Sequence, residues 1–163
     1  MAEIIYEERL FSRWMTLILG GVTLFILWQA MQQLQTGSSD GAPVWLMPSM
    51  AVLFVVFTIN FMWLTIRITA EEVVVSYGLF RYRVRWHDIE DCYADEASAV
   101  WYGGYGVRVG WRAGKRRLIY NTIGDPRVVL LTRSTPTPEF VFSTAYPDEV
   151  IQAVRGRLKL EKR

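Results

Sequence analysis

The chain has almost no residues suited to catalysis or metal binding. Its 163 residues include one histidine, His87, and one cysteine, Cys92. A single cysteine excludes an internal disulfide framework and a thiolate pair for a metal. His87 is followed directly by Asp88, and we expect two adjacent residues on a turn not to face each other as triad members do. The sequence therefore predicts a non-enzymatic protein with no cofactor and no metal.

Charged residues are missing from two long stretches near the N-terminus. The first covers about residues 14–34 and the second about residues 44–66. A transmembrane helix needs roughly 20 predominantly apolar residues, and the lack of ionisable groups argues against an ion path. The sequence predicts two membrane spans surrounded by lipid. A signal peptide is the alternative interpretation of the first stretch.

Basic residues are absent from the loop between the two predicted spans. Of the 18 Lys and Arg residues, two precede the first span and 16 follow the second. The positive-inside rule therefore places both termini in the cytoplasm and predicts a multi-pass protein of the cytoplasmic (inner) membrane. Tryptophans enriched at membrane interfaces act as anchors. The candidate anchors are Trp14, Trp28, Trp45 and Trp63.

The remainder of the chain has the alternating pattern of strands and then the period of a helix. We divide the chain into residues 1–66, a tail with the two-helix hairpin, and residues 67–163, a cytoplasmic domain. The predicted strands cover residues 66–69, 73–78, 81–86, 91–96, 105–111, 117–122, 128–132 and 139–144. A helix is predicted at about 147–160, with proline and acids in its first turn. The pattern indicates a small barrel or sandwich capped by that helix.

Several short motifs follow one another in a recognisable order. Two spans lead into IRITAEEVVVSYGLFRYRVRWHDIED (66–91), followed by YGGYGVR (102–108) and TAYPDEVIQAV (144–154). This order resembles membrane-anchored bacterial and archaeal proteins with a PH-like (pleckstrin-homology-like) domain, over about residues 66–160. The resemblance implies a PH-like barrel of about seven antiparallel strands in two near-orthogonal sheets, with a C-terminal helix at one end. It also implies a scaffolding role.

Three arginines alternate along one predicted strand: Arg81, Arg83 and Arg85. One interpretation is a solvated edge strand whose charges prevent aggregation. The other is an interaction edge for an acidic partner, either a second copy of this chain or a different protein. On a second copy, the candidate acids are Asp91, Asp95 and Glu96.

Glycines and basic residues are concentrated in residues 101–117, WYGGYGVRVGWRAGKRR. The glycine spacing fits neither the dinucleotide fingerprint nor the P-loop, so we expect no nucleotide. A curved β-hairpin explains the glycines. Its basic residues are either part of that hairpin alone or contacts to anionic lipid, where each contributes on the order of 1 kcal/mol. They are Arg108, Arg112, Lys115, Arg116 and Arg117.

Two functions are consistent with these observations. The first is a membrane-anchored interaction or scaffold module, either self-assembling or an accessory subunit of a larger membrane complex. The alternative is a module that senses anionic lipid through residues 108–117. The formal net charge of +2 is too small to favour nucleic acid as a partner, and the acidic turn at Glu71 and Glu72 argues against specific phosphoinositide binding.

Overall fold

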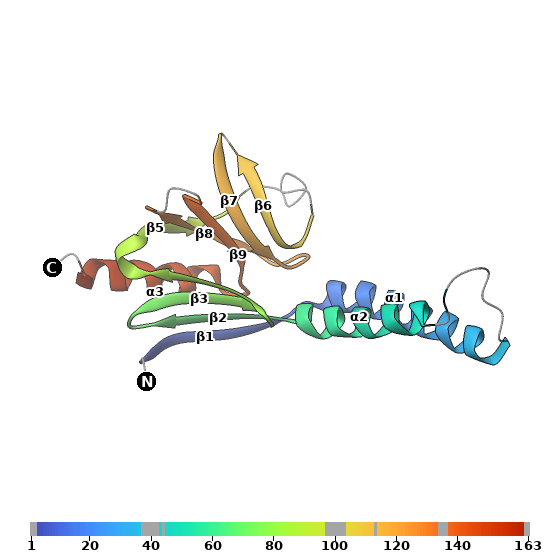
Figure 1. Cartoon of the computed structure of the whole chain (residues 1–163). Helices are drawn as coiled ribbons and strands as arrows, with labels where there is room; N and C mark the ends of the chain where they lie inside the picture. Colours follow the sequence, from blue (N-terminus) through green and yellow to red (C-terminus); the bar gives the residue numbers. More distant parts are fainter. Residues whose placement is uncertain are drawn as a thin grey trace.

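The computed structural model describes residues 3–36, 43, 45–96, 104–112, 114–133 and 137–161. It consists of a helical hairpin at one end and a β domain with a C-terminal helix at the other (Figure 1).

The helical hairpin consists of α1 (Arg13–Thr36) and α2 (Leu46–Phe61), which lie side by side (Figure 1). Between them, the hydroxyl oxygens of Thr23 and Thr58 are 3.0 Å apart and hydrogen-bonded. Ala30 and Ala51 are 6 % and 3 % exposed. Small buried side chains of this kind let two helices approach closely.

One of the two predicted spans has the length of a membrane-crossing helix. The segment Arg13–Gln35 of α1 is long and apolar enough, with a mean hydropathy of 1.6. The apolar helix α2 has 16 residues, which corresponds to about 24 Å. The stretch expected to span at 44–66 is not one helix, because the chain enters a strand at Trp63.

The first sheet has four antiparallel strands in the order β1-β2-β3-β4. They are β1 (Ile4–Phe11), β2 (Trp63–Thr69), β3 (Glu72–Tyr77) and β4 (Phe80–Arg85). Only Ser12 separates β1 from α1, and only Met62 separates α2 from β2. The Ser12 N–H donates to the Met62 carbonyl at 2.9 Å and joins these two connections. The sheet is therefore a direct continuation of the hairpin.

The N-terminal residues form part of the β domain. They were expected to be a tail within residues 1–66, but β1 pairs with β2 from Ile4↔Thr69 to Phe11↔Trp63. The expected boundary after residue 66 falls inside β2. The domain is therefore built from both sides of the hairpin, because two strands that leave the same end of a helix pair can pair with each other.

The second sheet has five strands in the order β5-β8-β9-β7-β6. They are β5 (Ile89–Ala94), β6 (Gly106–Arg112), β7 (Lys115–Asn121), β8 (Arg127–Thr132) and β9 (Glu139–Ser143). The 3-10 turn η1 (Trp86–Asp88) connects the sheets, and α3 (Pro147–Glu161) ends the described chain. The pair β7–β9 is parallel, whereas the other pairs are antiparallel.

The prediction of a mainly-β domain with a C-terminal helix is confirmed, but that of a single closed barrel is wrong. The described chain contains nine strands in two separate sheets. After β4 the chain crosses through η1 and pairs β5 with β8, so the first sheet does not continue into the second. The parallel β7–β9 pair also departs from the expected antiparallel arrangement.

The inner faces of the two sheets form the core together with α3. The first sheet contributes fully buried side chains such as Leu64, Ile66 and Val75, and the second contributes Phe140 and Phe142. Val150, Val154 and Leu158 of α3 close the same cluster. Apolar residues at every second strand position fill this core, which leaves the alternate positions of the first sheet facing outward.

Candidate functional site

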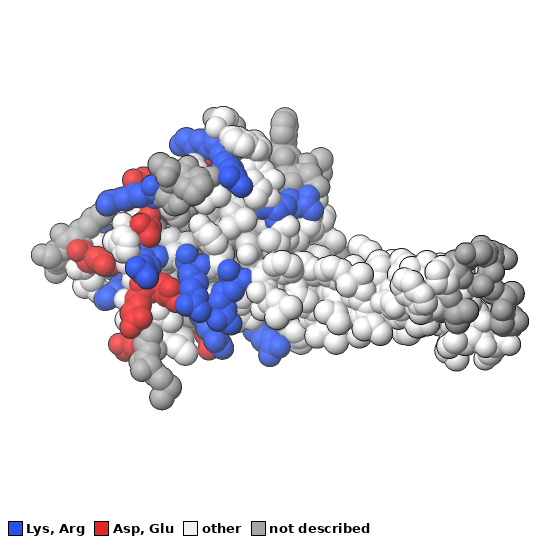
Figure 2. Space-filling view, viewed as in Figure 1, with Lys and Arg blue, Asp and Glu red and all other residues white. Residues whose placement is uncertain are grey.

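Arginine is the commonest residue at the outward positions of the four-stranded sheet. We call this surface the arginine face; it consists of Arg9, Arg67, Arg81, Arg83 and Arg85, all exposed. Two glutamates, Glu7 and Glu72, lie among them. A patch of basic side chains over this sheet lies beside the start of the hairpin (Figure 2). The face therefore has an excess of positive charge.

Strand register arranges this face in rows that run across the sheet. The first row, next to the hairpin, pairs Phe11 with Trp63. The second row reads Arg9, Thr65, Ser76 and Arg81. The third reads Glu7, Arg67, Val74 and Arg83, and the fourth pairs Glu72 with Arg85. Successive rows are about 6.6 Å apart, because outward side chains recur every second residue of a strand.

The rows differ in how their arginines are neutralised. In the third row, Arg67 Nε lies 2.7 Å from Glu7 Oε1. Arg83 Nη1 lies 3.8 Å from Glu72 Oε1. The second row contains no acid, and Arg9 instead places its guanidinium 4.5 Å from the centre of the Trp63 ring. Uncompensated charge is therefore greatest in the row closest to the aromatic pair.

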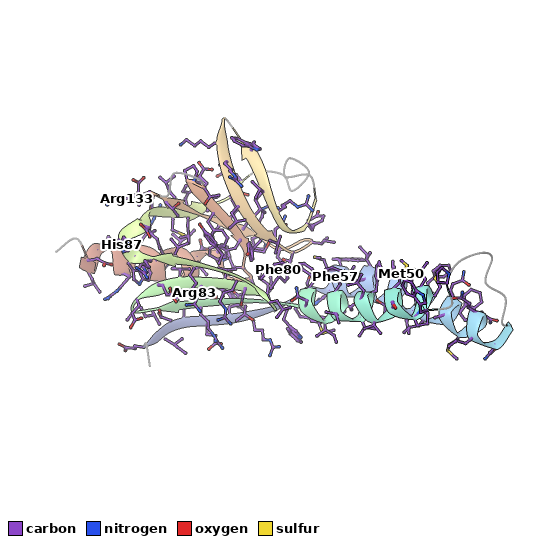
Figure 3. All side chains as sticks on the ribbon, in the orientation of Figure 1. Met50, Phe57, Phe80, Arg83, His87 and Arg133 are labelled. Carbon is purple, nitrogen blue, oxygen red and sulfur yellow. The ribbon has the colours of Figure 1, made fainter. Side chains whose placement is uncertain are left out.

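The turn between β3 and β4 is fixed against the last turn of α2. The side-chain Oδ1 of Asn60 accepts the Leu79 N–H at 2.7 Å. Gly78 has φ of 48°, and a Cβ there would lie 2.3 Å from Asn60 Oδ1. Phe61 packs on Phe80 with ring centres 5.7 Å apart, and Figure 3 places Phe80 at the junction with the hairpin. Leu79 remains 85 % exposed.

Sequence reasoning identified the arginines of β4 but missed their neighbours. Arg81, Arg83 and Arg85 lie on β4, an edge strand among the described sheets, as the alternation indicates. Arg9 was assigned to a tail, and Arg67 was not singled out. The signal for Arg9 was its place in IIYEERLF, where apolar and charged residues interleave directly before an apolar helix.

The strand register places three of the predicted lipid contacts, Arg108, Lys115 and Arg117, on one face of the second sheet and Arg116 on the other. Arg117 is wrong as a lipid contact, because it is 7 % exposed and forms an ion pair with Glu139. Lys115 and Arg116 are exposed at the end of the β6–β7 hairpin that lies away from α1 and α2 (Figure 1). Arg108 Nη2 donates to the Tyr105 carbonyl at 2.5 Å. The side chain of Arg112 lies outside the described residues.

Arg117 belongs to a buried cluster of ionic groups on the second sheet. Arg127 Nε lies 3.1 Å from Asp95 Oδ2, and Arg117 Nη1 lies 3.9 Å from Asp95 Oδ1. Lys115 Nζ lies 3.9 Å from Glu139 Oε1. A hollow of about 690 Å³ opens beside this cluster. The mutual pairing of both signs is typical of structural ion pairs.

The predicted tryptophan anchors lie at three levels along the molecule. Trp14 lies in the first turn of α1 and Trp63 begins β2, so both mark the junction of hairpin and sheet. Trp45 precedes α2 at the other end of the hairpin. Trp28 lies within α1, eight residues before its end.

The geometry of His87 and Asp88 differs from expectation. His87 Nε2 lies 3.3 Å from Asp88 Oδ1, so the two side chains do face each other. The side chains are 65 % and 43 % exposed on η1. Because both side chains are exposed, no packing holds the imidazole and the carboxylate apart.

No known protein family, curated protein or solved structure matches this chain.

Proposed function

We propose that this chain is a non-enzymatic, membrane-anchored interaction module. In this proposal it is an accessory subunit that holds an acidic segment of another membrane-associated protein. The observation that carries the proposal is the arginine face, where five exposed arginines share one sheet surface with two glutamates.

The anchor in this proposal is the whole helical hairpin. Both β1 and β2 meet the hairpin at the same end, so the β domain lies on one side of the membrane if α1 and α2 both cross it. The 16 residues of α2 cover about 24 Å of a hydrocarbon core that is about 30 Å thick. The flanking Trp45, Met62 and Trp63 are apolar and extend that length. The 16 basic residues after the hairpin favour a cytoplasmic β domain.

The edge strand β4 provides a backbone on which a partner can add a strand. In the described sheets β4 pairs only with β3, so its other edge is available for β-augmentation. A partner strand with Asp or Glu at every second position would place acids opposite Arg83 and Arg85. Cross-strand pairs of opposite charge each contribute roughly 0.2–1 kcal/mol.

A second copy of this chain fits β4 poorly. An antiparallel β4–β4 pair that keeps both sheet faces continuous places an arginine of one copy opposite an arginine of the other, and like charges directly opposite are destabilising. Two of the three acids that were candidates on a second copy are already engaged, and the third, Glu96, is exposed. Asp91 pairs with Arg155 at 3.2 Å, and the Asp95 side chain is 2 % exposed. These contacts favour a different protein as the partner.

Site-specific cross-linking in native membranes tests the proposal. A photo-reactive phenylalanine at Val74 lies on the arginine face between Arg67 and Arg83. We expect it to capture an acidic segment of one other protein, identified by peptide mass spectrometry. The variant Arg83→Glu with Arg85→Glu should lose this product at least fivefold.

The matched control is Arg133→Glu with Lys159→Glu, which changes the net charge equally on exposed residues elsewhere. Figure 3 shows Arg133 at the end of the domain away from the hairpin, and this control should keep the product. Cross-links to a second copy, to a segment without acids or to no protein would overturn the proposal. An equal loss of the cross-linked product in the arginine-face variant and in the control variant would also overturn it.

A further inference from the structure

The second row of the arginine face, which holds the arginines closest to the helical hairpin, differs from the later rows in charge and in position. It contains Arg9 and Arg81 without an acid, directly beside the Phe11–Trp63 row. We propose that Arg9 and Arg81 bind phosphate groups of phospholipids in the leaflet around the hairpin, while Leu79 inserts beneath them. This inference rests on the proposed anchoring of the hairpin in a membrane.

The strand register gives the depth of each row. The strands of the first sheet run on from the hairpin, so rows along the sheet lie at increasing distance from the helices (Figure 1). The headgroup layer on each side of a bilayer is about 5–8 Å thick, from the difference between its total and hydrocarbon thickness. With Phe11 and Trp63 at the interface, Arg9 and Arg81 lie about 6.6 Å further out, within this layer.

The next rows lie beyond the reach of the headgroups. Arg67 and Arg83 lie about 13 Å from the aromatic row, and Arg85 lies about 20 Å away. These are also the arginines that share their rows with Glu7 and Glu72. Acids therefore accompany the arginines that face the cytoplasm and are missing where anionic phosphates are closest. Guanidinium groups suit phosphate because they donate two parallel hydrogen bonds.

The β3–β4 turn supplies an apolar group at the same end of the sheet. Leu79 is 85 % exposed, and the adjacent Phe80 is 44 % exposed. The hydrogen bond from the Leu79 N–H to Asn60 holds this turn against α2. A large apolar side chain that is held in this position beside an apolar helix is suited to the acyl boundary of the bilayer. Arg81, two residues later, then lies at headgroup level.

The first arm of the test measures retained lipid. The full chain is placed in nanodiscs that contain phosphatidylcholine and phosphatidylglycerol in a 3:1 ratio, and bound phospholipid is counted by native mass spectrometry. We expect Arg9→Gln with Arg81→Gln to lower the retained phosphatidylglycerol at least threefold. The matched variant Arg83→Gln with Arg85→Gln should leave it unchanged. An equal effect of both pairs, or no effect of either, would overturn the inference.

The second arm measures depth and does not depend on the arginine variants. A spin label at Leu79→Cys in a Cys92→Ala background should be more accessible to oxygen than to a water-soluble nickel complex. A label at Leu160→Cys, on α3, serves as the aqueous control because Leu160 is 63 % exposed. A Leu79 label as water-accessible as the control overturns the inference.

Alkaline carbonate extraction tests the membrane anchor separately from the headgroup contact. If the chain remains in the membrane pellet while the Leu79 label is water-accessible, the headgroup contact is wrong and the anchor stands. If the chain is released into the supernatant, both the anchor and the headgroup contact are wrong.

Discussion

The side-chain Oδ1 of Asn60 accepts a hydrogen bond of 2.7 Å from the backbone N–H of Leu79. This contact joins the last turn of α2 to the β3–β4 turn, so the hairpin and the sheet are connected at a third point besides their two chain connections. The close approach requires a glycine at position 78, where φ is 48°. The contact between Asn60 and Leu79 therefore helps to orient the arginine face relative to the helical hairpin.

We predict that Asn60→Ala and Gly78→Ala have non-additive effects on stability. Asn60→Ala should cost about 1 kcal/mol through the lost hydrogen bond. Gly78→Ala adds left-handed strain of about 1–2 kcal/mol and a clash with the Asn60 side chain at 2.3 Å. In the double variant the side-chain clash disappears, so the total cost should be less than the sum. Urea unfolding in detergent measures the free energy of unfolding of the unmodified chain, both single variants and the double variant. Strictly additive losses would mean that Asn60 and the residue at position 78 do not interact.

Glu8 is predicted to be the most important charged residue of β1 for stability. Its carboxylate accepts hydrogen bonds from the Thr144 hydroxyl at 2.5 Å, the Ala145 N–H at 2.7 Å and the Tyr6 hydroxyl at 2.9 Å. Burial, followed by the hydrogen bond to Glu8, raises the pKa of Tyr6. Glu8→Ala should cost about 3 kcal/mol, because bonds to charged groups are strong and buried donors lose their acceptor.

The matched variants for Glu8 are Glu8→Gln, which keeps one acceptor oxygen, and Glu7→Ala on the exposed face. We expect the loss of stability to decrease in the order Glu8→Ala, Glu8→Gln, Glu7→Ala. Hydrogen exchange should show faster opening of β1 and of the start of α3 in Glu8→Ala. Equal stability of Glu8→Ala and Glu7→Ala would mean that the carboxylate does not hold β1 to the segment before α3.

Substitution by methionine should lower the stability of the chain far more at Arg117 than at the adjacent Arg116. Arg117→Met leaves Glu139, which is 4 % exposed, without its main cation. Removing one partner of a buried pair costs about 3–5 kcal/mol. Arg116→Met, on an exposed position, should stay within about 0.5 kcal/mol. The double change Arg117→Met with Glu139→Leu should cost less than Arg117→Met alone in urea unfolding, and a larger cost would contradict the pairing.

The sequence predicted those parts of the fold whose signals are local. Alternation in residues 81–86 identifies β4 and the outward direction of its arginines. The run of proline and acids at Pro147 identifies the start of α3. The uncharged stretch at about residues 14–34 identifies most of α1. The resemblance to PH-like domains and the role of the arginine face stay predictions.

Features that depend on distant residues could not be predicted in the same way. β1 was missed because its partner β2 lies beyond both helices of the hairpin, and because the buried Glu8 has the composition of a surface residue. Arg117 was grouped with its basic neighbours, although its acids come from β9 and from Asp95, the residue after β5. Pairing between distant segments decides both cases, and a single sequence contains no direct record of it.

Cys92 should be unreactive until the β domain unfolds. Its side chain is fully buried in the core, and this burial, followed by the negative charge of Asp91, raises the pKa of the Cys92 thiol to about 12. Iodoacetamide at pH 8 should therefore label the native chain at least 100-fold more slowly than the chain in urea. Rapid labelling without denaturant would show that the core around β5 opens.

The same thiol should make the domain less stable in alkali. The ordinary pKa of the group is 9.0, so between pH 9 and about 12 the unfolded chain loses a proton that the folded chain keeps. Stability must therefore fall as the pH rises through this window, by about 1 kcal/mol between pH 8 and pH 10 for one group. Cys92→Ala removes this contribution, although its smaller side chain lowers stability at every pH. Urea unfolding at pH 8 and pH 10 should show a smaller loss in Cys92→Ala than in the unmodified chain. An identical loss in both would mean that the thiol ionises as readily in the folded core as in water.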